Sequence, residues 1–260
     1  MAIPKEPRPR ALEGLSLDAV VLDTDGVITD TARVHAAAWK RTFDAFLYRR
    51  ARERGEEPRP FDTGADYLRH VDGRPRADGV RAFLASRGID LPEESPPGSG
   101  QASVTSLAED KDAAFLAVLD RDGVTAFPST VALVRRLRRD GVRVAAVSAS
   151  RNCARVLAAA GLDTLFDVRV DGVDAARLAL AGKPAPDLFL EAARRLGARP
   201  ERTAVVEDSL AGVEAGRRGG FALVVGVDRA GQAAALAERG ADVVVEDLAE
   251  LEPAPGVGPR

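Results

Sequence analysis

Short runs of apolar residues, most of them rich in valine, recur along the chain. A run that is apolar at almost every position is typical of a strand that is covered on both faces of a parallel sheet. Several of these runs end in a polar or acidic residue. We predict strands over residues 19–23, 142–148, 166–170, 203–208, 221–227 and 242–246.

Segments with helical spacing of apolar residues separate most of these runs. In the clearest one, Ser129 is a suitable N-cap, Val131, Val134 and Leu137 share one face, and Gly141 is a suitable stop. Alternation of strands and helices predicts an α/β protein with a doubly wound, parallel, Rossmann-like sheet. The helices between the strands are predicted over residues 129–140, 152–160, 186–196, 210–217 and 231–239.

Residues 31–124 break this rhythm, because they contain no strong signal for a buried strand. A long helical pattern covers residues 34–54, and shorter helices are predicted over 79–86 and 107–119. We therefore predict a helical cap domain, residues 31–124, inserted into a core of residues 1–30 and 125–260. The two crossings between cap and core are expected near residues 29–33 and 120–127.

Composition narrows the class of protein. With 260 residues of which 45% are hydrophobic, the chain can bury a sizeable interior. A net charge of −3 argues against a dedicated nucleic-acid binder, and no apolar run reaches membrane-spanning length. The single cysteine, Cys153, excludes an internal disulfide and fits a reducing compartment. We expect a cytoplasmic monomer without a nucleic-acid or membrane partner.

Polar side chains stand where the predicted strands end. In a parallel sheet the carboxyl ends of the strands meet at one edge, where ligands bind. Each signal is weak alone: an Asp-Gly pair also starts a plain turn, and Asp208 or Ser209 also suits the N-cap of a helix. Their combination in this order is informative. The residues concerned are Asp23, Asp25, Ser148, Lys183, Glu207 and Asp208.

Such a cluster of carboxylates needs a cation. Two like charges about 4 Å apart repel by roughly 4 kcal/mol at an effective dielectric constant near 20. Carboxylate oxygens attract a hard divalent ion, and Mg²⁺ is the usual ion where phosphate supplies further ligands. With Lys183 and Ser148 nearby, one carboxylate is free to attack phosphorus and another to handle the proton of an alcohol.

Four motifs of the chain together resemble those of the haloacid dehalogenase superfamily. They are DTDG at 23–26, SAS at 148–150, GKPAPD at 182–187 and VVEDSLAGVEAG at 205–216. The segment DGVITDTARVHAAAWK, residues 25–40, is more narrowly similar to the β-phosphoglucomutase branch, as are SASRN and KPAPDLF. The resemblance implies a Rossmann-like core with an inserted cap.

The resemblance also implies roles for individual residues. Asp23 would be the nucleophile that forms an aspartyl phosphate, and Asp25 the general acid and base. Asp23, Asp25, through its backbone carbonyl, Glu207 and Asp208 would hold Mg²⁺. Ser148 and Lys183 would hold the transferring phosphoryl group.

Further positions match the mutase branch. His35 belongs to the catalytic set by its place in the matched segment, whereas His70 matches no motif and is expected to be a surface or packing residue. Arg76 matches a contact to the distal phosphate, with Arg74 as a competitor. The expected substrate-binding residues are Thr31, Trp39, Gly73, Arg76, Lys111, Ala149 and Asn152.

The resemblance implies a β-phosphoglucomutase that converts β-D-glucose 1-phosphate to glucose 6-phosphate. A phosphatase acting on a sugar phosphate or another small metabolite is the alternative, because the two differ in whether the cap keeps water from the aspartyl phosphate. A catalytically silent, partner-binding domain is a third reading, against which the intact acidic residues count. A nicotinamide enzyme is disfavoured, because no GxGxxG motif follows the first strand.

Overall fold

The computed structural model describes residues 16–96 and 98–251, so the parts of the predicted core at 1–15 and 252–260 lie outside it. Its centre is a six-stranded sheet in which every pairing is parallel, with the strand order β3-β2-β1-β4-β5-β6. The predicted parallel sheet is confirmed. The strands are β1 (Ala19–Asp23), β2 (Arg143–Val147), β3 (Val168–Val170), β4 (Thr203–Glu207), β5 (Leu223–Val227) and β6 (Val243–Val245).

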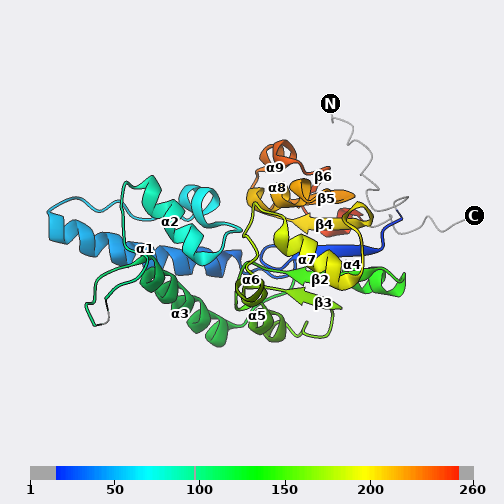
Figure 1. Ribbon diagram of the computed structural model, residues 1–260, viewed down its shortest axis with the longest axis horizontal. Coiled ribbons are helices and arrows are strands. Elements are labelled where there is room, and N and C mark those ends of the chain that lie inside the picture. The colour runs from blue at the N-terminus through cyan, green and yellow to red at the C-terminus, as the bar shows by residue number, and fades with distance from the viewer. Residues whose placement is uncertain (1–15, 97, 252–260) are drawn as a thin grey trace, which may run out of the picture.

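Helices cover both faces of the sheet, as Figure 1 shows. One face packs against α4, α5 and the short 3₁₀ helix η3, and the other against α7, α8 and α9. Valines of the central strands are fully buried because both faces are covered. The helices around the sheet are α4 (Pro128–Arg139), α5 (Cys153–Ala159), α6 (Gly172–Leu178), α7 (Asp187–Leu196), α8 (Leu210–Arg218), α9 (Ala233–Arg239), η2 (Pro200–Arg202) and η3 (Leu248–Leu251).

One sequence expectation about these helices is wrong, and one helix was not predicted. Ser129 does not cap α4: Pro128 opens the helix, where a missing N–H costs nothing, and the Ser129 hydroxyl donates to Asp247 over 3.0 Å. Helix α6 was not predicted, because its larger apolar residues form no buried face: Val173 and Leu178 are 54% and 38% exposed. Its start is fixed by Asp171, whose side chain accepts hydrogen bonds from the N–H groups of Val173 and Asp174.

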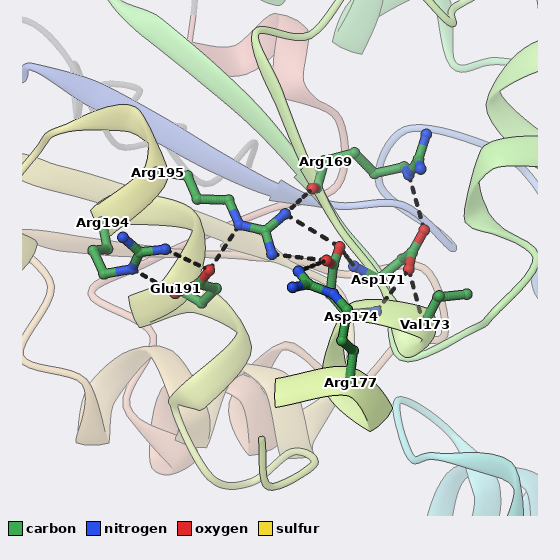
Figure 2. A network of polar contacts seen from close by, with 8 residues as sticks. All are labelled: Arg169, Asp171, Val173, Asp174, Arg177, Glu191, Arg194 and Arg195. Atoms are coloured by element: carbon green, nitrogen blue, oxygen red, sulfur yellow. Dashed lines mark hydrogen bonds and ion pairs between the residues drawn. The ribbon is translucent and has the colours of Figure 1, made fainter. Parts of the chain in front are cut away.

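A network of ion pairs fastens α6 to α7 (Figure 2). Asp174 accepts from Arg195 over 2.7 Å and from Arg177 over 2.9 Å, and Glu191 accepts from both Arg194 and Arg195. These contacts hold the pKa values of Asp174 and Glu191 near 2, through the hydrogen bonds from the guanidinium groups. The network therefore keeps α6 in place beside the cleft described below.

Three helices and one π-helical turn stand between β1 and α4 in the chain and pack apart from the sheet (Figure 1). Their interior is aromatic: Trp39, Phe43, Phe61 and Phe83 stack or tilt against one another with ring centroids about 4 to 5 Å apart. This group is the cap. It consists of α1 (Ala32–Arg54), η1 (Tyr67–Val71), α2 (Arg76–Ser86) and α3 (Val104–Asp122).

The two crossings between cap and sheet run side by side. The N–H of Asp30 donates to the carbonyl of Thr125 over 2.9 Å, and the N–H of Phe127 donates to Ile28 over 3.0 Å. Beside them, Phe115 and Leu119 of α3 pack against Val156 of α5. Within the described residues, no helix combines the length and apolarity that crossing a bilayer requires.

Candidate active site

Three carboxylates meet at the carboxyl edge of the sheet. Asp23 is the last residue of β1, Glu207 is the last of β4, and Asp208 follows it. Each offers an oxygen such that the three oxygens lie within 4.8 Å of one another. Asp23 and Glu207 are almost fully buried, with exposed fractions of 5% and 0%. The parallel pairing of β1 with β4 brings these distant parts of the chain together.

Lys183 is the cation of this cluster. Its Nζ forms ion pairs with both Asp23 and Glu207, and its side chain is buried. Burial alone would lower the pKa of Lys183, but the two carboxylates raise it above the ordinary value. Burial raises the pKa of Asp23 well above its usual range, and burial together with Glu207 does the same for Asp208. One ammonium group thus leaves the cluster short of positive charge.

Two glycines make room for these carboxylates. A Cβ on Gly26 would lie 1.7 Å from Oδ2 of Asp208, and one on Gly212 would lie 1.8 Å from Oε1 of Glu207. Gly26 also has a φ of +85°, which side chains disfavour. Any larger residue at either position would displace an acidic side chain from the cluster.

The donor set fits Mg²⁺. The oxygens are hard ligands, their number exceeds what Lys183 can neutralise, and the site borders a small cavity. Glu207 is held by two backbone N–H groups, those of Asp208 over 2.6 Å and Ser209 over 2.7 Å. The residues present could therefore hold a divalent ion together with an anionic ligand.

Asp25 lies beside the cluster at the centre of a separate hydrogen-bond network. One of its oxygens accepts from the hydroxyl of Thr31 and lies 3.2 Å from Nε2 of His35. The other accepts from Ser148 over 3.1 Å, and the Asp25 N–H donates to Asp23 over 2.9 Å. Burial would raise the pKa of Asp25, but His35 and the two hydroxyl donors lower it. Asp25 is thus held as a carboxylate.

A lysine of the cap completes this network. Nζ of Lys111 lies 2.5 Å from Nδ1 of His35, whose ring stacks on Phe115 with centroids 4.2 Å apart. Lys111 also lies over the rings of Trp39 and Phe115. Burial, followed by the charge of Arg76, lowers the pKa of Lys111 to about 7. Burial and Lys111 lower the pKa of His35 as well.

Most of the residues singled out in the sequence line one small cavity between cap and core. Its volume is about 60 Å³, which is enough for a few water molecules but not for a sugar phosphate. His70 is outside it, near Phe83 of the cap interior. The cavity lining includes Asp23, Asp25, His35, Trp39, Gly73, Arg76, Lys111, Ala149, Lys183 and Asp208.

Four of the expected site residues stand behind this lining. Thr31 and Ser148 are buried beneath Asp25, and Glu207 is buried beneath Lys183. Asn152 does not line the cavity, and its amide donates to Asp112 over 2.6 Å.

The structure adds residues that the sequence reasoning missed. Tyr67 and Asp72, at the two ends of the π-helical turn η1, line the cavity from the cap side, next to Arg74. Burial and the nearby Glu207 raise the pKa of Asp72 to about 7, and burial and Asp72 raise that of Tyr67. A π-helical turn has no apolar periodicity that marks it, so only the position of Asp72 directly before Gly73 offered a signal.

The cap rests directly on the core around this cavity. A methyl group on Gly73 would lie 2.4 Å from the hydroxyl oxygen of Ser209, and one on Gly182 would lie 2.4 Å from Cγ of Pro75. Next to this contact, a cleft of about 980 Å³ opens to the surface, with α6 as one wall. The cleft and the closed cavity share Arg74, Arg76, Ala149 and Lys183.

Comparison with known proteins agrees with this geometry. A model of the haloacid dehalogenase-like hydrolase family matches residues 17–220. The β-phosphoglucomutase of Mycobacterium bovis is 49% identical over 237 residues, which cover 90% of each chain. The trehalose-phosphate phosphatase of Mycobacterium leprae is 43% identical over 142 residues, 52% of this chain and 31% of that protein. The crystal structure of a β-phosphoglucomutase from Clostridium difficile superimposes with a TM-score of 0.70 at 23% identity and covers 91% of this chain and 93% of that one.

Proposed function

Because the chain belongs to the haloacid dehalogenase-like hydrolase family, we propose that it is a β-phosphoglucomutase. It converts β-D-glucose 1-phosphate to glucose 6-phosphate through a phosphorylated aspartate. The observation that carries the proposal is the arrangement of Asp23, Asp25 and Lys183 beneath a cap that closes on them. The similarity to the mycobacterial enzyme over nine-tenths of the chain supports the same reaction.

Asp23 is the nucleophile in this proposal. In the working cycle it carries a phosphoryl group and transfers it to the 6-hydroxyl of β-glucose 1-phosphate. The bisphosphate then turns round, and Asp23 attacks the phosphorus at position 1, so that the bond to the sugar oxygen breaks and glucose 6-phosphate leaves. Lys183, which already contacts Asp23, holds the transferring group, and Ser148 is placed to assist it.

Asp25 moves the proton in both half-reactions. It accepts the proton of the attacking 6-hydroxyl and later returns it to the leaving oxygen at position 1. Thr31 and Ser148 orient the carboxylate, and Lys111 acts on it through His35. His35 and Lys111 both belong to the cap, so the contact between His35 and Asp25 is the one that joins the cap to the acid and base.

Mg²⁺ is the proposed cofactor, held by Asp23, Glu207, Asp208 and the backbone carbonyl of Asp25. When bound, it supplies the positive charge that balances the carboxylates and the oxygens of the transferring phosphoryl group. Asp208 and Glu207 keep the site in place, since each is fitted against a glycine without a side chain.

Substrate exchange requires the cap to move, because the closed cavity holds only a few waters. We propose that residues 31–124 move as one body on the core of residues 1–30 and 125–260, with the paired crossings as hinges. The end of the sugar that lies away from Asp23 would contact residues of the cap, namely Trp39, Gly73, Arg74 and Arg76. Ala149 would contact the end that lies next to Asp23. The substrate is a small phosphorylated sugar, and one chain supplies all the residues that the reaction uses. A cytoplasmic location fits such a substrate and the lone cysteine.

A phosphatase acting on sugar phosphates is the second candidate, favoured by the likeness of half of the chain to a trehalose-phosphate phosphatase. The test supplies β-glucose 1-phosphate, Mg²⁺ and a trace of the 1,6-bisphosphate, and follows glucose 6-phosphate and free phosphate separately. We expect glucose 6-phosphate to form much faster than free phosphate. Fast phosphate release without glucose 6-phosphate would establish the phosphatase, and no turnover of either kind would rule out the mutase.

The matched control is Asp23→Asn, which keeps the shape of the side chain and removes the nucleophile. We expect turnover to fall at least about 10⁴-fold with an unchanged circular dichroism spectrum. Substantial residual turnover would reject Asp23 as the nucleophile.

A further inference from the structure

Asp112 of α3 lies at the boundary between cap and core, and nothing in the sequence singled it out. It follows Lys111, but its side chain points to other partners. One of its oxygens, Oδ1, accepts from Nη1 of Arg76 over 2.7 Å and from Nδ2 of Asn152 over 2.6 Å. Both Arg76 and Asn152 are among the residues expected to bind substrate.

The two donors come from opposite sides of the cleft. Arg76 begins α2 in the cap, whereas Asn152 precedes α5 in the core. The side chains of Arg76 and Asp112 are only 22% and 27% exposed, so solvent screens their ion pair less than one on the open surface. Arg76 and Asp112 both belong to the cap, so the hydrogen bond from Asn152 is the contact through which this carboxylate oxygen joins the cap to the core beside the active site.

A second polar link between the same two helices has a different setting. Arg155 of α5 and Asp120 of α3 form an ion pair of 2.5 Å, but their side chains are 52% and 63% exposed. Pairs of this kind contribute little, because water and salt screen them. Asp120 thus offers a matched control, as an aspartate of the same helix that also bridges cap and core.

The proposed reaction requires a site for a second phosphate. While one phosphoryl group is bound at Asp23, the other end of the hexose bisphosphate needs donors elsewhere in the cleft. Arg76 lines both the closed cavity and the open cleft, so it is placed for that role. In the structure, however, its Nη1 is occupied by Asp112, and the amide of Asn152 is turned to the same oxygen.

We propose that Asp112 is a built-in competitor of the substrate's second phosphate. Its carboxylate holds Arg76 and Asn152 together across the boundary and so keeps the cap closed before substrate arrives. The incoming phosphate takes over these donors and releases Asp112. Because the phosphate must displace Asp112, the protein binds it more weakly than Arg76 and Asn152 would if Asp112 were not there. This inference rests on the proposed function for the identity of the ligand.

The test compares the wild type with Asp112→Asn, which keeps the size of the side chain and removes its charge, and with Asp120→Asn. Binding of glucose 6-phosphate is measured by calorimetry in the presence of Mg²⁺, and the radius of gyration without ligand by small-angle X-ray scattering. For Asp112→Asn we expect a Kd about fivefold lower and a larger radius of gyration, since a weakened partner frees the donors and the cap. For Asp120→Asn we expect both values to stay close to the wild type.

An unchanged or higher Kd in Asp112→Asn would overturn the competition, because Asp112 would then help to hold the phosphate. If glucose 6-phosphate binds to none of the three proteins, the proposed function fails, and the scattering measurement alone decides whether Asp112 holds the cap. Equal radii of gyration in all three proteins would overturn the role of Asp112 in holding the cap closed.

Discussion

Lys183 lies between the carboxylates of Asp23 and Glu207 and forms an ion pair with each of them. All three side chains are buried, so each charge is stabilised by its ion-pair partner and not by water. A buried carboxylate that loses its partner is costly, which makes Lys183 a determinant of stability as well as of phosphate binding.

Replacement of Lys183 with methionine should therefore destabilise the protein by about 3–5 kcal/mol. Urea denaturation measures the free energy of unfolding. Lys40→Met is the control, because Lys40 pairs with Asp44 and donates to the carbonyl of Phe61 but keeps a side chain that is 45% exposed, and we expect its replacement to cost about 1–2 kcal/mol. Equal losses of unfolding free energy in the two variants would show that burial of the lysine does not determine its contribution to stability.

Addition of Mg²⁺ should raise the melting temperature, because the ion binds the folded acidic cluster and not the unfolded chain. Asp208→Asn should abolish most of this rise, whereas Asp110→Asn, at an exposed position of α3, should retain it. Differential scanning calorimetry with and without chelator measures the effect. A full rise in Asp208→Asn would place the ion elsewhere.

Stability should depend on pH through Lys111. In the folded protein Lys111 loses its proton near pH 7, whereas in the unfolded chain it keeps the proton until its ordinary pKa of 10.5. The unfolded state binds more protons between these values, so the contribution of Lys111 to stability rises with pH across this window. The free energy of unfolding of Lys111→Met should exceed that of the wild type most below pH 7, and the difference should shrink toward pH 10.5.

Denaturant titrations of both proteins at pH 6 and pH 9.5 measure that difference. The free energies of unfolding of Lys111→Met and the wild type could also differ by the same amount at both pH values. That result would show that Lys111 stays charged in the folded protein.

Closure of the cap should be sensitive to Gly73, where a methyl group would collide with Ser209 of the core. We expect Gly73→Ala to lower kcat/KM at least tenfold. Gly88→Ala is the matched control: its φ of +63° is close to the +66° of Gly73, but nothing lies within 4 Å of the added carbon. Both variants should lose about 1–2 kcal/mol of stability from the strained backbone, and only the first should lose activity. Equal kinetics in the two variants would show that this contact does not matter for closure.

The sheet and its acidic edge could be predicted from the sequence because both follow from local patterns. Valine-rich runs mark buried strands, and a parallel order brings the strand ends that carry Asp23 and Asp208 to one edge. The predicted range of β1 is exact, whereas the other five predicted ranges run one or two residues past one or both ends of the strand, since the type of a flanking residue does not show where the ladder stops. The catalytic assignments themselves remain predictions that the experiments above address.

The cap was less predictable because its contacts arise from packing between helices. The position of Asp112 between Arg76 and Asn152 depends on how α3 lies against α2 and α5, which no local pattern encodes. The same holds for Tyr67 and Asp72, which reach the cavity only through the π-helical turn. Helix α6 was not predicted because Val173 and Leu178 are exposed and form no apolar face, while the side chain of Asp171 fixes its start.

Helix α1 begins one residue after Thr31 and runs for 23 residues, a rod of about 35 Å. A rotation of about ten degrees at the paired crossings would sweep its far end through about 6 Å, but would shift His35, within about 6 Å of the pivot, by only about 1 Å. The helix thus rotates about a point next to Asp25. The outer edge of the cap can move far enough for a sugar to pass, while the imidazole of His35 stays close to the carboxylate of Asp25.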